Sequence, residues 1–349
     1  MFFASDNWAG ASDRVMAALS SANDGFAPAY GDDDISRRVV TRFSEIFERE
    51  VAVFFVATGS SANSLALAIS AKPGGAVFCH DEAHVAVDEC GCPEFMTGGS
   101  KLVRIQGANG KITPDGLTKA MSAFAEGFVH NGRPQAVTIT QSTEIGTVYE
   151  FDEIAAIKRV ADTRSLPLHM DGARFANALV SLGVTPAEMT WKAGVDLLSF
   201  GGTKNGCWCA EAVVVFDKDK AGELAWLRKR AGQLFSKSRF IAAQFEGYLA
   251  DDHWLDLARH SNAMAQKLAD AVEASDNAWL PARPQANETF IVVKKNRIEA
   301  MREAGAAFYE WPADGQAPDQ ALNSEEELIR LVTSFRTSEA DIENFVALL

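Results

Sequence analysis

The residues that decide the fold are DLLSFGGTKNG, at positions 196–206. The apolar run at 197–200 is typical of a buried strand, and the two glycines behind it turn the chain just before Lys204. A lysine at the end of a buried strand is shielded from water, so it loses its proton more easily and forms an imine with an aldehyde. The segment therefore predicts a sheet that presents a reactive lysine, the alternative being an exposed loop lysine.

Strand-like and helix-like segments alternate on either side of this stretch. We expect strands at 51–57, 76–79, 102–105, 136–140, 168–170 and 212–216. Helices are expected at 36–50, 60–70, 114–128, 151–163 and 174–182. The run at 213–216 should pair with 197–200 as a hairpin-like return. Strands interleaved with helices in this order predict an α/β fold with a mostly parallel sheet.

The length of 349 residues favours two domains. We expect an N-terminal segment at 1–35, a large domain at 36–250 and a small C-terminal α/β domain at 251–349. A long helical region at 222–274 should break near Gly232 and near 251–252. The small domain should contain strands at 289–293, 308–311 and 327–333, helices at 297–304 and 338–349, and a surface loop at 312–324.

Charge and composition narrow the class of partner. With 33 basic and 47 acidic residues, the net charge is −14, which disfavours nucleic acid and anionic membranes and favours a small-molecule partner. No apolar run reaches the roughly 18–20 residues of a membrane helix, and the N-terminus lacks the basic start of a signal peptide. The five cysteines lack zinc-like spacing, so we expect reduced thiols, no metal and a cytoplasmic protein.

A phosphate-binding motif follows the first expected strand. ATGSSAN, at 57–63, puts a glycine and hydroxyl residues at the start of a helix. Free backbone N–H groups and the positive end of the helix dipole favour a phosphate there. The alternative is that Ser60 or Ser61 is only a helix N-cap.

HMDGAR, at 169–174, ends another expected strand. Its Asp171 can face the ring nitrogen of a ligand and keep it protonated; the alternative is a helix N-cap aspartate followed by a solvated Arg174. Together with Lys204 and the phosphate motif, Asp171 supplies the three anchors that pyridoxal phosphate requires, for its aldehyde carbon, phosphate and ring nitrogen. The three motifs jointly predict a pyridoxal-phosphate enzyme.

Beyond these motifs, the sequence resembles the threonine aldolase family, in the beta-eliminating lyase group of fold-type-I pyridoxal-phosphate enzymes. The resemblance covers nearly the whole chain. It is carried by SDN at 5–7, YGDDD at 30–34, TGSSAN at 58–63, HVAVDECG at 84–91, MDGAR at 170–174, the Lys204 segment and RLVT at 330–333. It implies a mostly parallel sheet of the seven-stranded type and a smaller C-terminal α/β domain.

For the cofactor, the resemblance implies a set of contacts at the three motifs and at one histidine. Gly59 and Ser60 would bind the phosphate, and the imidazole of His84 would stack on the ring. Asp171 would pair with the ring nitrogen, and Lys204 would form the Schiff base. The full set of implied cofactor contacts is Gly59, Ser60, His84, Asp171, Arg174, Thr203 and Lys204.

For the amino-acid substrate, the resemblance implies that Ser5, Arg174 and Arg330 hold the carboxylate. Arg330 stands between two apolar residues of an expected strand, which fits a bidentate clamp on a buried carboxylate. A strand arginine that reaches solvent is the alternative. Tyr30 would enter the active site of a neighbouring subunit, so we expect a homo-oligomer, either a tetramer or a dimer.

Two positions depart from the family pattern. Many members have a histidine where this chain has Glu144, and many have an aromatic residue where it has Asp88. The base that takes the β-hydroxyl proton is therefore His84, Glu144 or a water held by the phosphate. The family's basic residue that reaches the phosphate is also displaced, with Lys237 and Arg239 as candidates.

The expected reaction is the retro-aldol cleavage of L-threonine, L-allo-threonine or phenylserine-type amino acids to glycine and an aldehyde. The nearest alternative is another reaction on the same cofactor, such as β-elimination, racemisation or decarboxylation. A degenerate relative that only binds or regulates is a further alternative, which the intact Lys204 and Asp171 disfavour.

Overall fold

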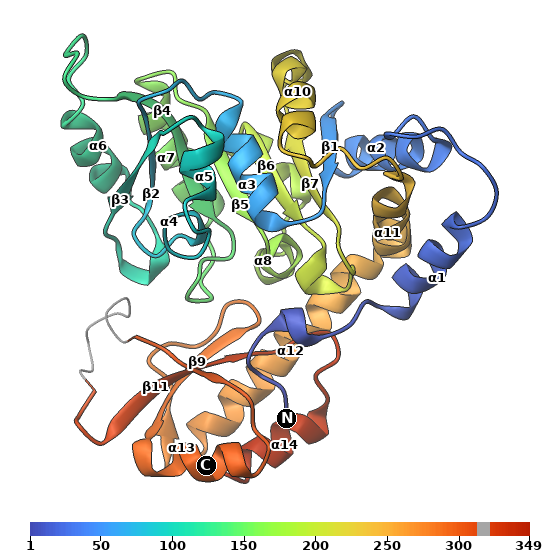
Figure 1. Ribbon diagram of the computed structural model, residues 1–349. Coiled ribbons are helices and arrows are strands. Elements are labelled where there is room, and N and C mark those ends of the chain that lie inside the picture. Colours follow the sequence, from blue (N-terminus) through green and yellow to red (C-terminus); the bar gives the residue numbers. More distant parts are fainter. Residues whose placement is uncertain (313–321) are drawn as a thin grey trace.

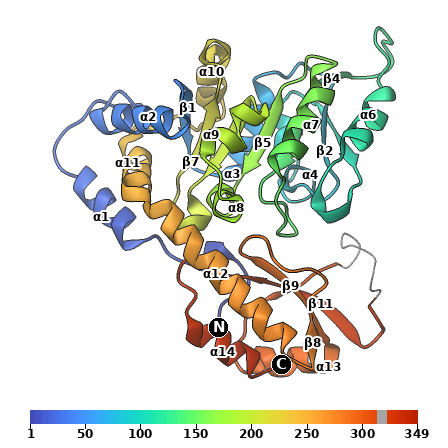
Figure 2. The same cartoon turned by 180° about the vertical axis from the view of Figure 1, so that it is seen from behind.

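The computed structural model describes residues 1–312 and 322–349, which form two sheets with flanking helices (Figures 1 and 2). The larger sheet lies in the upper half of Figure 1 and the smaller sheet in the lower half. The loop expected at 312–324 falls largely on residues 313–321 and so lies outside the described residues. The α/β fold expected from the sequence is confirmed.

The larger sheet has seven strands in the order β1-β7-β6-β5-β4-β2-β3. Strand β7 is antiparallel to both of its neighbours, and the other neighbouring strands run parallel. The hairpin-like return is confirmed, since β6 and β7 pair directly. The strands are β1 (Ala52–Val56), β2 (Gly75–His80), β3 (Lys101–Ile105), β4 (Arg133–Thr140), β5 (Leu168–Gly172), β6 (Leu197–Gly201) and β7 (Glu211–Val215).

Helices cover both faces of this sheet (Figures 1 and 2). Leu197 and Leu198 of β6 point into apolar clusters on opposite faces, which is why the strand is apolar throughout. The Leu197 face carries α3 (Gly59–Ala68) and α10 (Gly222–Arg230). The Leu198 face carries α6 (Pro114–Ser122), α7 (Phe151–Asp162) and α8 (Phe175–Leu182).

The remaining helices of this half lie around the sheet. Helices α1 and α11 pack on each other, and α11 also packs on α2. Of the helices described, none has both the length and the apolar composition that crossing a bilayer demands. The helices that lie around the sheet are α1 (Asp13–Ala22), α2 (Asp34–Ile46), α4 (His84–Val87), α5 (Cys92–Met96), α9 (Pro186–Met189) and α11 (Arg239–Leu249).

Several predicted helices end early, and the difference is largest for the one expected at 114–128. The helix expected at 114–128 ends at Ser122. Phe124 turns into the core and packs edge-on against Phe78 at 5.4 Å between ring centroids, and Gly127 adopts a φ of +74°. The packing of one aromatic side chain and a left-handed glycine therefore stop the helix before its apolar pattern ends.

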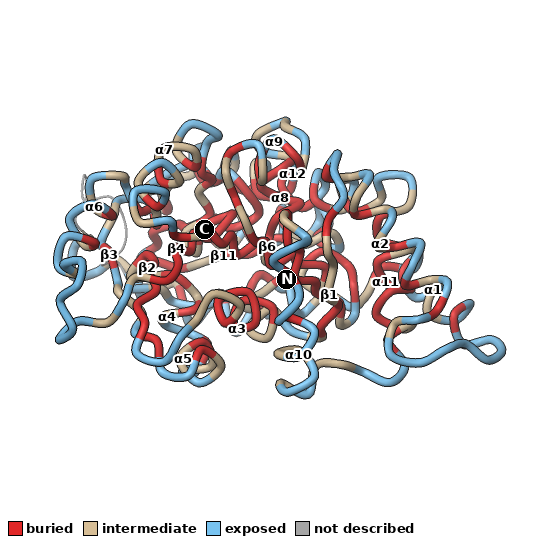
Figure 3. The backbone as a smooth tube through the Cα atoms, turned by 90° about the horizontal axis from the view of Figure 1, so that it is seen from above, coloured by how far each residue is buried: buried red, intermediate tan, exposed pale blue. Residues whose placement is uncertain are grey.

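Phe200 anchors the lysine-bearing strand β6 in the core. Its ring centroid lies 5.0 Å from Phe43, 5.5 Å from Phe175 and 5.7 Å from Trp254. These rings come from α2, α8 and α12 (His253–Glu273), so three helices converge on one residue of the strand. Figure 3 shows the buried segments along the strands at the centre of the molecule and the exposed ones at its rim. The end of β6 is thus fixed by packing.

The smaller sheet has four antiparallel strands in the order β10-β11-β9-β8. Its strands are β8 (Ala278–Trp279), β9 (Glu288–Lys294), β10 (Tyr309–Glu310) and β11 (Glu326–Val332), with helices α13 (Lys295–Glu303) and α14 (Glu339–Val346). The two-residue β8 was not expected, because it is too short to show a strand pattern. Helix α12 runs from the large half of the molecule along the small sheet (Figure 2).

The N-terminus joins the small sheet rather than the large one. Phe3 donates its backbone N–H to Ala307, and its carbonyl accepts the N–H of Val332, both at 2.8 Å. The short helix η1 (Asp6–Trp8) then lies between the two halves (Figure 1). The first residues of the chain are therefore placed where the two halves meet.

Candidate active site

A cavity of about 250 Å³ opens at the carboxyl ends of strands β1, β5 and β6. Open α/β sheets bind their ligands at this edge. Asn7, Asn63 and Glu211 also line it, and no role was predicted for them. The predicted residues that it brings together are Gly59, Ser60, His84, Asp171, Thr203 and Lys204.

The N-terminus of α3 forms one wall of the cavity. Thr58 caps this helix, because its Oγ1 accepts the backbone N–H of Ser61 at 3.2 Å. The alternative that Ser60 or Ser61 is the cap is therefore wrong, and Ser60 lines the cavity instead. A Cβ added at Gly59 would meet no atom within 4 Å, so open space lies in front of the helix end. The arrangement suits an anion such as phosphate.

The turn that carries Lys204 requires its two glycines. A Cβ on Gly201 would lie 2.5 Å from the carbonyl oxygen of Ala173, and one on Gly202 would lie 2.7 Å from that of Ala210. The following short helix η4 (Thr203–Asn205) is held by Asn205, whose Nδ2 donates to the Tyr248 hydroxyl and to a backbone carbonyl. Lys204 is half-buried, so it is not a free loop lysine.

Asp171 lies inside β5 and is almost fully buried. Its Oδ2 accepts the Asn63 side-chain N–H at 2.7 Å, and its Oδ1 accepts the backbone N–H of Ala173 at 3.0 Å. Burial and the nearby Glu89 raise the pKa of Asp171, against the opposing effects of His84, Lys204 and Asn63. The alternative of a helix N-cap aspartate is wrong, because α8 begins only at Phe175.

His84 begins α4 and is oriented by a buried acid. Its Nδ1 lies 2.9 Å from Oε1 of Glu89, and the same oxygen accepts an N–H of Asn63 at 2.8 Å. This hydrogen bond raises the pKa of His84 more than burial lowers it, and the charges of Glu144 and Asp171 raise it further. Glu89 and Asn63 therefore link the histidine to the buried aspartate.

Glu211 is a buried acid at the start of β7, and it lines the same cavity as Lys204. Its Oε1 accepts the backbone N–H of Thr203 at 3.3 Å. Burial raises the pKa of Glu211 to about 7.

Arg174 and Arg330 lie in a charge cluster beside the cavity. Arg174 is buried, with its Nε 2.8 Å from Oδ2 of Asp6 and its Nη1 3.1 Å from Oε2 of Glu288. Arg330 has a side chain only 13% exposed, and its Nη1 lies 3.7 Å from Oε1 of Glu288. Neither arginine is solvated, so both solvent-facing alternatives are wrong.

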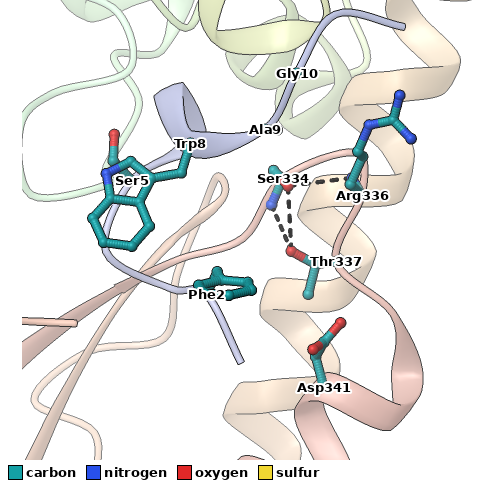
Figure 4. Close-up of a pocket in the computed structure, with 9 residues that line it drawn as sticks. All are labelled: Phe2, Ser5, Trp8, Ala9, Gly10, Ser334, Arg336, Thr337 and Asp341. Atoms are coloured by element: carbon teal, nitrogen blue, oxygen red, sulfur yellow. Dashed lines mark hydrogen bonds between the residues drawn. The ribbon is translucent and has the colours of Figure 1, made fainter. Parts of the chain in front are cut away.

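Apart from the two arginines and Glu144, four predicted residues lie outside the cavity lining. Ser5 accepts the backbone N–H of Asn7 and lines a separate cavity of about 270 Å³ with Phe2 and Trp8 (Figure 4). Tyr30 is exposed and donates its backbone N–H to the Ser236 carbonyl. Lys237 is also exposed, and the Arg239 side chain donates to the Gly25 carbonyl. Glu144 is half-buried, and its charge acts on both His84 and Arg174.

Some residues of the site have no role that the sequence alone predicts. Asn63 and Glu89 stand inside recognised motifs, but nothing in the sequence indicates that they contact Asp171 or His84. Glu211 and Glu288 gave a usable signal, because each is a single acid at the start of an apolar strand. A charge in such a place is buried and therefore calls for a partner or a function.

Comparisons with known proteins bear out the resemblance. A family model described as beta-eliminating lyase matches residues 3–296. A low specificity L-threonine aldolase of Pseudomonas aeruginosa is 45% identical over 315 residues, which cover 90% of each chain. Another, from a Pseudomonas species, is 41% identical and covers 99% of this chain and 96% of its own. The solved threonine aldolase of Leishmania major matches with a TM-score of 0.91 at 26% identity, over 99% of this chain and 98% of that one. This chain belongs to the beta-eliminating lyase family.

Proposed function

We propose that this chain is a pyridoxal-phosphate-dependent aldehyde-lyase. It cleaves L-threonine, L-allo-threonine and phenylserine-type amino acids to glycine and an aldehyde. The observation that carries the proposal is the convergence of Lys204, Asp171 and the N-terminus of α3 on one cavity. The lyase family and the names of the two Pseudomonas relatives support the same reaction.

The residues of the cavity fit pyridoxal phosphate. The N-terminus of α3 would take the phosphate through its backbone N–H groups and Ser60, in the open space before Gly59. The buried carboxylate of Asp171 would hold a proton on the ring nitrogen, and Lys204 would bind the aldehyde carbon. When bound, the cofactor supplies a cationic ring that takes up the electron pair from a broken bond to Cα.

Other residues of the cavity would keep these groups in place. Glu89 fixes the ring of His84, which would lie against the cofactor, and Asn63 fixes the Asp171 carboxylate. Thr203 holds the turn next to Lys204, because its Oγ1 accepts the backbone N–H of Ala210 at 3.2 Å. These contacts orient the reacting groups before a substrate arrives, which lowers the entropic cost of reaction.

The two arginines would select the substrate and the bond that breaks. Arg174 and Arg330, with Ser5, would hold the amino-acid carboxylate. The bond from Cα to the carboxylate carbon is then kept out of the alignment with the cofactor ring that its cleavage requires. The bonds from Cα to hydrogen and to Cβ remain. A β-hydroxyl that gives its proton to a base favours cleavage between Cα and Cβ. His84, Glu144 and a phosphate-held water are the three groups available for this step.

We also propose the wider organisation of the protein. Residues 36–250 form the cofactor-binding domain, 251–349 the small domain, and 1–35 an N-terminal arm. A homo-oligomer, tetramer or dimer, is supported by the exposed Tyr30 and by exposed aromatic side chains such as Phe26 and Trp226, which fit a subunit contact. A cytoplasmic location is supported by the five free cysteines, which fit a reducing compartment.

The products from threonine test the reaction. Purified holoenzyme should release glycine and acetaldehyde in equal amounts from L-threonine, and glycine and benzaldehyde from phenylserine, while serine should be a poor substrate. The control is 2-aminobutyrate, which has no β-hydroxyl proton and should give no glycine. If threonine yields mainly 2-oxobutanoate and ammonia, the chain is an eliminating dehydratase and the proposal is wrong.

A further inference from the structure

Two carboxylates and two guanidinium groups meet where three parts of the chain come together. Asp6 comes from η1, Arg174 follows β5, Glu288 begins β9, and Arg330 lies on β11. On β11, Arg330 stands two residues before Val332, the register partner of Glu288, so the two side chains are diagonal neighbours on one face of the small sheet. The cluster therefore connects the N-terminal helix and both sheets.

The two carboxylates are held very differently. Asp6 accepts two hydrogen bonds from Arg174, at 2.8 and 3.2 Å, and a third from Asn287 at 3.1 Å. Glu288 is fully buried, with Oε2 3.1 Å from Nη1 of Arg174 and Oε1 3.7 Å from Nη1 of Arg330, but among the described residues neither contact has hydrogen-bond geometry, and Nε of Arg330 has no partner. A buried polar group without a well-formed hydrogen bond costs about 1–3 kcal/mol, so Arg330 keeps a donor free for a further acceptor.

The plane of the Arg330 guanidinium is held by stacking, but its N–H groups are not all used in hydrogen bonds. Its guanidinium lies over the Trp311 ring at 4.2 Å from the centroid, and its contact with Glu288 is long, at 3.7 Å. Stacking of this kind holds the plane of an arginine while its edge N–H groups stay free for a carboxylate. Arg330 therefore has more free N–H donors for a bound carboxylate than Arg174 has.

The net charge of the cluster would change if the carboxylate of a bound amino acid joined the two that it already contains. Asp6 and Glu288 contribute two negative charges, and Arg174 and Arg330 contribute two positive ones, so the buried cluster is neutral. A bound amino acid would add one negative charge to it. The loop that carries Glu144 packs directly on Glu288, since a Cβ on Gly146 would lie 2.8 Å from the Glu288 carbonyl oxygen. An uncompensated negative charge in such a buried place is costly.

Of the two carboxylates, Glu288 is the one suited to accept a proton. Burial, Glu144 and Asp6 raise the pKa of Glu288 more than Arg174 and Arg330 lower it. Burial also acts to raise the pKa of Asp6, but Arg174, Lys204 and Asn287 hold it below its usual value. Asp6 thus stays ionised under conditions in which Glu288 gains a proton.

We propose that Glu288 is a positioning residue for the substrate carboxylate: it holds Arg330 beside Arg174 and takes up one proton from solvent when that carboxylate binds. The proton returns to solvent when the product glycine leaves, so no redox or covalent change is involved. The proposal rests on the proposed function, in which Arg174 and Arg330 hold this carboxylate. The proposal fixes the direction in which carboxylate affinity changes with pH. As pH rises, Glu288 ionises in the free enzyme, and the binding of a carboxylate weakens.

The test compares two ligands of the holoenzyme that differ by a carboxylate. Dissociation constants for glycine and for methylamine are measured from the visible absorbance of the cofactor between pH 6 and pH 9. Their ratio isolates the contribution of the carboxylate, because both ligands carry an amino group. In the wild type, the preference for glycine should fall by at least tenfold across this range. In Glu288→Gln it should stay constant within about threefold. The matched control is Glu327→Gln, an acid-to-amide change on β11, which should behave as the wild type.

Two further measurements separate this inference from the function on which it rests. Arg330→Ala should abolish most of the preference for glycine; if it does not, the proposed carboxylate clamp fails. If Arg330→Ala removes the preference while Glu288→Gln keeps the wild-type pH slope, only the role of Glu288 is wrong. Calorimetry of glycine and methylamine binding to the wild type, in buffers of different ionisation enthalpy, needs no variant. Glycine should take up more protons than methylamine, whose amino group makes the same change without a carboxylate, and equal uptake would overturn the proposal.

Discussion

Replacing Asp171 by Asn removes one negative charge from the cavity with little change of shape. The carboxylate now accepts from Asn63 and from Ala173, and an amide oxygen can accept from only one of them. The lost hydrogen bond should cost about 1–3 kcal/mol of stability. Asn63 also donates to Glu89, so it keeps its orientation, and the new amide can turn its oxygen toward Asn63 and give up only the hydrogen bond from Ala173. The variant should therefore fold.

The catalytic cost of Asp171→Asn should be much larger than its cost in stability. Two unit charges about 4 Å apart attract each other by roughly 4 kcal/mol at an effective dielectric constant of about 20. Without this attraction, the ring nitrogen gives up its proton and the ring takes up electrons poorly. At about 1.4 kcal/mol per tenfold change, the rate should fall by roughly 10³-fold. Glu89 cannot replace the lost charge, because Asn63 stands between it and Asp171.

The assay is the rate of glycine release from L-threonine at saturating substrate, with bound cofactor measured by absorbance in the same samples. Asp171→Asn should bind the cofactor and lose about 10³-fold in kcat. Asp115→Asn makes the same change at an exposed position of α6 and serves as the control. If the cofactor-loaded Asp171→Asn variant works within threefold of wild type, the carboxylate has no electronic role and this reasoning is refuted.

Two more substitutions test the remaining roles. Lys204→Ala should abolish turnover together with the visible absorbance of the lysine-bound cofactor, measured on the purified protein, and near-normal rates would disprove the assignment of Lys204. Glu144→Gln should lose less than about tenfold in kcat/KM. Because the charge of Glu144 raises the pKa of His84, the acidic limb of the pH–rate profile should move to lower pH, whereas loss of that limb with a collapse of rate would make Glu144 the base.

Most of the fold and the centre of the site could be predicted because their signals are local. Strands such as β6 are continuous apolar runs, and glycine turns mark where they end. The motifs around Gly59, Asp171 and Lys204 follow three strands whose carboxyl ends meet at one edge of the sheet. Strand order then brings them together without any knowledge of side-chain contacts.

The partners of the charged residues could not be predicted, because they depend on packing between distant parts of the chain. Arg174 and Asp6 are 168 positions apart, and no local pattern indicates that they meet. The same holds for Glu288 and Arg330, which are joined only by the register of two antiparallel strands. Sequence spacing locates residues on strands and helices; it does not give the charge balance of a cluster built from four separate segments.

Glu144 shows how this balance changes the interpretation of a single substitution. The resemblance stated from the sequence makes Glu144 a departure from the family pattern, which implies a histidine at this position that could act as a base. In the structure its charge raises the pKa of both His84 and Glu288, so it acts on the cofactor cavity and on the arginine cluster together. A neutral histidine at this position would remove this effect and a protonated one would reverse it, so either would make both groups easier to deprotonate. An acid here instead helps His84 and Glu288 to retain their protons at higher pH. The substitution is therefore an electrostatic change that acts on both sites at once, and removing the charge of Glu144 should let both His84 and Glu288 lose their protons at lower pH.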